Sequence, residues 1–148
     1  MADIQRQTAE RVIKAGYFNR NVFRQKEKLI LVLKTGIAGM YFHVDMESSE
    51  GRSLIAKLVP GAELFLYREA DNEYDQWAIS VYSENDKQIG YVTRFKNEAI
   101  ARLMDCGKRF FAFVDEPPGP SSMEAKAADR GLTTEDFTLP FSIYLEDK

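Results

Sequence analysis

The fold is best predicted from residues 61–94, which read GAELFLYREADNEYDQWAISVYSENDKQIGYVTR. Leu64 and Leu66 alternate with other residues before the polar segment READNEYD, and Ile79 and Val81 alternate after it. Such alternation is typical of a strand with one buried face. The pattern predicts three consecutive strands, the last being IGYV. The first connection is longer than the roughly two to five residues of an ordinary hairpin loop.

Upstream of this stretch, the sequence predicts helices and a long strand. The expected elements are a helix at 3–17, a basic connection at 18–28, a strand at 29–34 that resumes at 37–44, and a helix at 48–58. The continuous apolar run at 29–33 is typical of a buried strand. Gly39 indicates a bulge or bend in its continuation.

Downstream, a helix and two further strands are expected. Residues 95–106 carry apolar side chains at helical spacing and end at Gly107, a typical C-cap residue. A strand follows at 109–114, then a Pro- and Gly-rich break, and then small polar residues at 123–136 with a short helix among them. Pro140 places the last strand, 137–145, at a sheet edge. About six strands and two or three helices favour a mainly β, α+β fold: a small, strongly bent sheet or barrel with helices packed over it.

Length and composition bound the class of protein. The 148 residues predict one domain with a sizeable core, and 45% apolar with 29% charged residues is ordinary for a soluble protein. No apolar run is long enough to cross a bilayer, and the N-terminus lacks an apolar signal-peptide core. The single cysteine fits a reducing compartment. We therefore expect a cytoplasmic protein without a membrane partner.

The charge distribution leaves nucleic-acid binding open. The net charge of −3 argues against a strong nucleic-acid binder, but residues 81–114 carry six basic and four acidic side chains. Folding can gather part of this charge on one basic surface, although ordinary solvated faces explain it too. The basic residues in question are Arg94, Lys96, Arg102, Lys108 and Arg109.

Few residues suggest catalysis or metal binding. One cysteine and one histidine cannot form a structural zinc site. An EF-hand loop counted from Asp71 needs Gly and Glu where this chain has Gln76 and Tyr82. No nucleophile elbow and no phosphate-binding loop occurs. We expect no enzyme, no cofactor and no metal.

Structural explanations exist for the remaining chemically suggestive residues. Cys106 and His43 can be written as a dyad, but a core cysteine and an ordinary strand histidine are simpler interpretations. In READNEYD, Asp71 and Asn72 are good turn residues. Tyr74 and Trp77 can simply pack on the core, and Arg68 can pair with Asp71 or Asp75.

The chain resembles the HIRAN domain family at residues 68–81, which read READNEYDQWAISV and are followed by IGYV and a helix. The hallmark of this family is a strand entering a loop of the type R-E-P-D-N-P-Y-D-x-x-A-I-x-V. GIAGMYF, residues 36–42, resembles the family's opening strand, which ends in paired aromatic residues. The resemblance implies a compact, OB-like β-barrel. It divides the chain into an N-terminal helix with a basic connection (1–28), a HIRAN-like domain (29–115) and a linker with an acidic C-terminal extension that holds the expected edge strand (116–148).

The resemblance also implies a function. In a helicase-linked member of the family, the domain binds the 3′ end of single-stranded DNA, with an aromatic pair stacking on bases and an aspartate meeting the terminal hydroxyl. The expected partner is therefore a single-stranded DNA end, in repair or processing carried out with a helicase or nuclease chain. The residues carried over are the stacking pair Tyr41 and Phe42, the end-sensing Asp75 with Tyr74, Tyr91 after the glycine, and Arg94 and Lys96 for phosphates.

Three departures from the family pattern favour an alternative. Met40 stands where the DNA-binding member has an arginine, Ala70 and Glu73 replace two prolines, and the net charge is negative. The alternative is a protein–protein interaction module on the same fold without DNA binding. The sequence makes no prediction of the oligomeric state.

Overall fold

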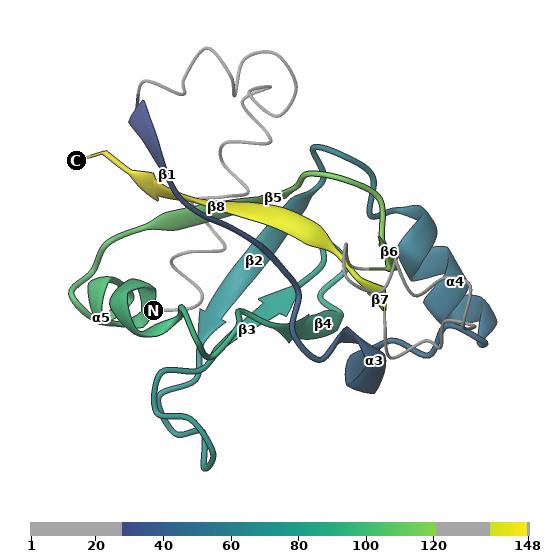
Figure 1. Cartoon of the computed structure of the whole chain (residues 1–148), viewed down its shortest axis with the longest axis horizontal. Helices are drawn as coiled ribbons and strands as arrows, with labels where there is room; N and C mark the ends of the chain where they lie inside the picture. The colour runs from purple at the N-terminus through teal and green to yellow at the C-terminus, as the bar shows by residue number, and fades with distance from the viewer. Residues whose placement is uncertain (1–27, 121–136, 148) are drawn as a thin grey trace.

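The computed structural model describes residues 28–120 and 137–147, so the helices expected at 3–17 and 123–136 lie outside the described residues. Within this part of the chain, strands dominate and helices are short (Figure 1). The elements are β1 (Leu29–Gly36), α3 (Met40–His43), α4 (Ser49–Ala56), β2 (Glu63–Arg68), β3 (Ile79–Tyr82), β4 (Gln88–Tyr91), α5 (Glu98–Asp105), β5 (Phe110–Val114), β6 (Gly119–Pro120), β7 (Phe137–Thr138) and β8 (Pro140–Glu146).

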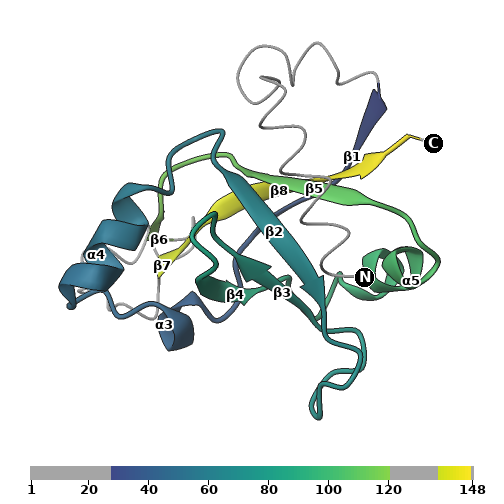
Figure 2. The same ribbon diagram turned by 180° about the vertical axis from the view of Figure 1, so that it is seen from behind.

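The main sheet has six antiparallel strands in the order β1-β8-β5-β2-β3-β4, and β6 pairs with β7 in a separate two-stranded ribbon. The stretch that predicted three consecutive strands forms β2, β3 and β4, each paired with the next. β2 pairs with β5 at only two positions, Glu63 with Phe113 and Leu64 with Ala112. The sheet therefore bends strongly at this junction (Figures 1 and 2). The predicted α+β fold with six strands is confirmed.

One isolated bridge brings the two ends of the sheet together without closing it into a barrel. Ala38, just after β1, exchanges two backbone hydrogen bonds with Tyr91 of β4, at 2.8 and 2.9 Å. Gly90 permits this approach, because a Cβ on it would lie 2.4 Å from Ile37 Cγ2 and 2.5 Å from the Ala38 carbonyl oxygen. The bridge places the segment after β1 beside β4.

The apolar core lies between the sheet and its helices. Ile79 and Val81 of β3 are fully buried, and Ser80 between them is buried as well, so β3 is covered on both faces and not on one. Helix α5 contributes Ile100, Ala101 and Met104 to the same core, while Arg102 on its other face is exposed. α5 thus packs on the sheet through one face, which fixes the turn between β4 and α5 relative to the strands.

The expected continuation of β1 as a strand through residues 37–44 is wrong. Gly39 adopts φ 72° and turns the chain, and residues Met40–His43 form the single helical turn α3. The Val44 amide donates to the Met40 carbonyl at 3.0 Å. Glycine reaches this left-handed conformation without the steric penalty that a Cβ brings. The bend expected at Gly39 is confirmed, and the aromatic pair that follows it lies on a helical turn.

Two strands, β1 and β8, differ from the sequence prediction in whether they lie at the edge of the sheet. β8 is not an edge strand but lies between β1 and β5. Pro140 is tolerated there because it is the first residue of β8, and its carbonyl accepts a hydrogen bond from the Asp115 amide at 2.9 Å. β1 is at the edge, and its residues 30–32 are exposed, so it is not the buried strand expected.

The remaining helices agree with the sequence. Ser48 caps α4, because its Oγ accepts a hydrogen bond from the Gly51 amide at 2.9 Å. Gly107 ends α5 with φ 91°, and its amide donates to the Met104 carbonyl at 2.9 Å. Cys106, at the end of α5, is exposed, so the expectation of a core cysteine is wrong. In the described part of the chain, no helix is long and apolar enough to span a membrane.

Replacing Gly90 tests the close approach that joins the sheet ends. We expect Gly90→Ala to lower the free energy of unfolding by roughly 1–3 kcal/mol, since the new Cβ overpacks against backbone and Ile37. Urea denaturation measures the loss. Gly119→Ala is the matched control, because a Cβ there meets no atom within 4 Å. Equal stability of the two variants would contradict this role of Gly90.

Candidate nucleic-acid interface

The long loop between β2 and β3 is organised by Asn72. The Asn72 Oδ1 accepts hydrogen bonds from the amides of Tyr74 at 2.8 Å and Asp75 at 2.9 Å. This arrangement confirms Asn72 as a turn-forming residue, since its side chain replaces a backbone acceptor. Asp71 beside it is exposed. The turn presents Tyr74 to solvent with 89% of its surface accessible, so packing of Tyr74 on the core is wrong.

Asp75 is held on both carboxylate oxygens. Its Oδ1 accepts from the Trp77 amide at 2.9 Å, and its Oδ2 accepts from the Asn97 Nδ2 at 2.8 Å. Asn97 is buried at the start of α5, and its side chain makes no capping bond to that helix. Each carboxylate oxygen has two acceptor positions, so Asp75 is oriented and still able to accept a hydrogen bond from a ligand.

Tyr91 connects the loop to the edge strand β4. Its hydroxyl donates to the Glu69 Oε1 at 3.0 Å, and the Asn72 Nδ2 donates to the same oxygen at 3.1 Å. Burial raises the pKa of the Tyr91 phenol above its ordinary value; a hydrogen bond with Gln88 opposes this shift, and the Glu69 carboxylate adds to it. Tyr91 is therefore a neutral donor that ties the loop to β4.

Helix α3 presents the aromatic pair. The rings of Tyr41 and Phe42 are 5.0 Å apart in an edge-to-face arrangement, and Phe42 is 82% exposed. His43 follows, with its ring 5.6 Å from that of Tyr91. Its Nδ1 donates to the Gly39 carbonyl at 3.0 Å, which leaves Nε2 as an acceptor in the neutral ring. His43 thus contacts β4 from α3 and is not an ordinary strand histidine.

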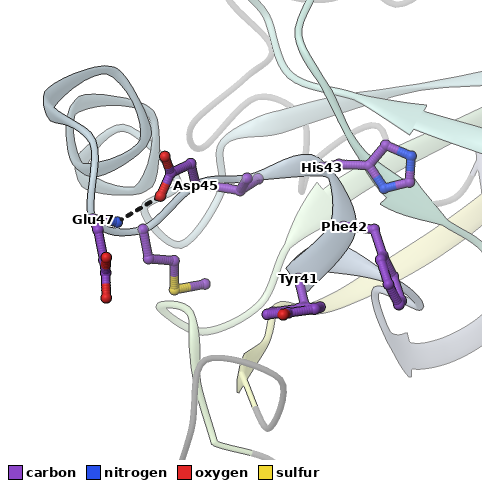
Figure 3. A pocket seen from close by; sticks show the side chains of 7 residues that line it. Tyr41, Phe42, His43, Asp45 and Glu47 are labelled. Atoms are coloured by element: carbon purple, nitrogen blue, oxygen red, sulfur yellow. Dashed lines mark hydrogen bonds between the residues drawn. The ribbon is translucent and has the colours of Figure 1, made fainter.

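A pocket of about 490 Å³ lies beside this aromatic pair and is lined by residues 41–47 (Figure 3). Tyr41, Phe42 and His43 line it from α3, and Asp45 and Glu47 line it from the segment that follows. The Asp45 Oδ1 accepts from the Glu47 amide at 3.0 Å. The two carboxylates make this part of the surface unfavourable for a phosphate group.

Arg68 and Arg102 are engaged within the fold. Arg68 does not pair with Asp71 or Asp75; its Nε lies 3.1 Å from Asp105 Oδ1, and its other nitrogens donate to carbonyls of the loop. The Arg102 guanidinium lies 4.3 Å from the Trp77 ring and pairs with Glu98 at 2.8 Å. Arg102 therefore contributes little to the basic surface that the sequence suggested.

Hydrogen bonds and one ring contact connect most of the predicted residues to one another. Tyr74 and Asp75 lie in the β2–β3 loop, and hydrogen bonds through Asn72 and Glu69 connect this loop to Tyr91. His43 connects Tyr91 to the helix that carries Tyr41 and Phe42. Arg94 and Lys96 follow β4, both are exposed, and neither forms an ion pair with another described residue.

Sequence reasoning missed three residues that build this site. His43, Glu69 and Asn97 each join two segments that are distant in sequence. Their residue types are common on any protein surface, and the partners of Glu69 and Asn97 in these bonds are 22 residues away. No local pattern signals such pairs. Asn97 at a helix start would have been interpreted as an ordinary cap.

The fold and site define a small α+β domain with an OB-like sheet, exposed aromatic residues and an anchored carboxylate. The HIRAN domain family model matches residues 30–128, and the chain belongs to this family. No curated protein sequence matches the chain.

Solved structures support the fold. A crystal structure of a protein from Lactobacillus plantarum is similar with a TM-score of 0.59 and 22% identity, covering 81% of this chain and 97% of that one. The crystal structure of the HIRAN domain of human HLTF is similar with a TM-score of 0.54 and 18% identity, covering 83% of each chain.

Replacing Asn97 tests whether it orients Asp75. Asn97→Asp keeps the shape but places a second carboxylate against Asp75, so we expect lower stability at pH 7. The two acids would share a proton in the folded state, which raises their folded pKa. The deficit relative to wild type should therefore shrink as pH falls toward about 4. Urea denaturation at both pH values measures this, with Asn85→Asp in an exposed turn as control. A deficit independent of pH would contradict the contact.

The raised pKa of Tyr91 predicts that the domain loses stability at alkaline pH. This pKa is raised in the folded state, so above about pH 10 the unfolded chain releases this proton first and stability falls as pH rises. We expect a smaller fall for Tyr91→Phe, measured by urea denaturation from pH 8 to 11. Tyr74→Phe, which removes an exposed hydroxyl, is the control. Identical curves for Tyr91→Phe and wild type would oppose this assignment.

Proposed function

We propose that this chain is a binding module for the 3′ end of single-stranded DNA. Asp75 accepts a hydrogen bond from the terminal hydroxyl, Tyr41 and Phe42 stack on bases, and Arg94 and Lys96 hold phosphates. In this proposal the chain binds DNA and does not catalyse, and it serves repair or processing enzymes such as helicases or nucleases. Membership of the HIRAN domain family supports the proposal.

The anchored carboxylate of Asp75 carries the proposal. An ionised carboxylate accepts hydrogen bonds but cannot donate one, so a free hydroxyl suits it and a phosphate repels it. The bonds from Trp77 and Asn97 hold it in one orientation before DNA arrives, which lowers the entropy cost of binding. Selection of an end over a continuous strand follows from this chemistry.

Cations for the phosphates come from the segment after β4. Met40, which replaces an arginine of the DNA-binding family member, is buried with 1% of its surface exposed, so position 40 is part of the core here. The pocket beside Tyr41 carries Asp45 and Glu47. Arg94 and Lys96 are the first two cations that follow Tyr91 in the sequence, and we assign the phosphate contacts to them.

A protein–protein interaction module is the second candidate. The acidic pocket beside Tyr41 and Phe42 favours it, because a basic peptide would find both apolar rings and carboxylates there. The negative net charge of the chain also favours such a partner over a polyanion.

Titration with labelled oligonucleotides tests the DNA proposal. We expect tighter binding of a strand with a free 3′-hydroxyl than of the same strand with a 3′-phosphate. Asp75→Asn should remove this preference, because the neutral amide no longer repels phosphate, while it retains an acceptor for the Trp77 amide. Lys96→Ala should weaken the binding of both oligonucleotides by the same factor and reduce the salt dependence of binding.

Two results would reject parts of this proposal. Equal affinity of the wild type for the two ends would remove Asp75 as an end sensor. No binding of either strand at low salt would leave the protein–protein interaction module as the better assignment. Circular dichroism and thermal unfolding of both variants serve as the check that the fold is retained.

A further inference from the structure

Phe95 is an exposed aromatic residue that the site described above does not use. Its side chain is 87% exposed, close to the 89% of Tyr74. Both residues lie within two positions of the hydrogen bond between Asp75 and Asn97. A single exposed ring is common on protein surfaces, so a ligand at Phe95 has to be inferred from the residues around it.

The backbone around Phe95 is fixed. The Phe95 amide donates to the Thr93 Oγ1 at 3.4 Å, and the Lys96 amide donates to the Thr93 carbonyl at 3.1 Å. Asn97 closes the segment, because it is buried, its side-chain Nδ2 donates to Asp75, and its backbone carbonyl accepts from the Ala101 amide at 2.8 Å. The turn between β4 and α5 therefore holds Phe95 in solvent without help from its side chain.

The charges beside Phe95 indicate what kind of ligand covers it. Arg94 and Lys96 flank the ring in sequence, are exposed, and form no ion pair with another described residue. The nearest acid along the chain, Glu98, is paired with Arg102. An aromatic residue between two free cations is the combination that binds single-stranded nucleic acid, where the ring stacks on a base and the cations meet the phosphates.

We propose that Phe95 carries the base of the 3′-terminal nucleotide, an inference that rests on the proposed function. The terminal hydroxyl and the terminal base belong to the same sugar, so a hydroxyl at Asp75 leaves its base close by. The Asp75–Asn97 bond holds the turn that carries Phe95 beside Asp75. Helices α3 and α5 lie on either side of β3 and β4 (Figures 1 and 2), so Tyr41 and Phe42 serve preceding bases from the other side.

A strand whose last nucleotide lacks its base but retains the 3′-hydroxyl tests this assignment. For the wild type, removal of the terminal base should weaken binding by roughly 5- to 150-fold, the range expected for one stacked base. Phe95→Ala should weaken binding of the complete strand by a similar factor. It should then bind complete and abasic strands with equal affinity, because the stacking partner is already absent.

Two variants make the comparison specific. Phe95→Tyr keeps an aromatic ring and should retain the sensitivity to the terminal base. Phe42→Ala removes a ring of similar exposure on α3. This variant should bind the complete and the abasic DNA strand more weakly than the wild type by the same factor, so its affinity should still fall when the terminal base is removed. Because Phe95 is exposed, thermal unfolding of Phe95→Ala should match that of the wild type.

The outcomes separate this inference from the function on which it rests. A wild type without preference for a 3′-hydroxyl over a 3′-phosphate would overturn the proposed function. If that preference is present and Phe95→Ala still distinguishes the complete strand from the abasic strand, the inference alone is overturned. The same holds if Phe95→Ala binds the complete strand as tightly as the wild type.

Discussion

Two backbone hydrogen bonds between Ala38 and Tyr91 determine the arrangement of this domain. They bring the segment after β1 against β4, although these two strands lie at opposite ends of the sheet order. The approach is possible only because position 90 has no side chain. As a result, α3 lies beside β4, and His43 contacts Tyr91.

A second constraint operates through side chains. Glu69, Asn72, Asp75 and Asn97 form a chain of hydrogen bonds that runs from Tyr91 to the start of α5. Buried and partly buried polar contacts of this kind are costly when incomplete, so they specify one arrangement of the loop. The loop is long and lacks the two prolines of the family pattern. Its order comes from these bonds instead of from a restricted backbone, and the carboxylate of Asp75 gains a defined orientation.

The surface charge explains why function is harder to infer than fold. Arg68 and Arg102 flank the Trp77 ring and pair with acids, so they stabilise the loop and α5 and leave little charge for a ligand. Asp45 and Glu47 lie beside the aromatic pair. Positive charge free for a polyanion lies instead in the turn after β4, at Arg94 and Lys96. One aromatic residue, Phe95, thus lies between two cations in a turn that the strand pattern alone would describe as a connection.

Local sequence patterns predict the three consecutive strands, the capped helices α4 and α5, the turn at Asn72 and the family, because each depends on residues close together along the chain. The other features depend on contacts between distant parts of the chain. Tertiary structure placed β8 inside the sheet and β1 at its edge, because strand order depends on pairing between distant segments. It formed α3 where a strand was expected, because Gly39 turns the chain toward Tyr91. It also joined Asp75 to Asn97 and exposed Phe95, since contacts between distant residues and the burial of a ring exist only in the folded chain.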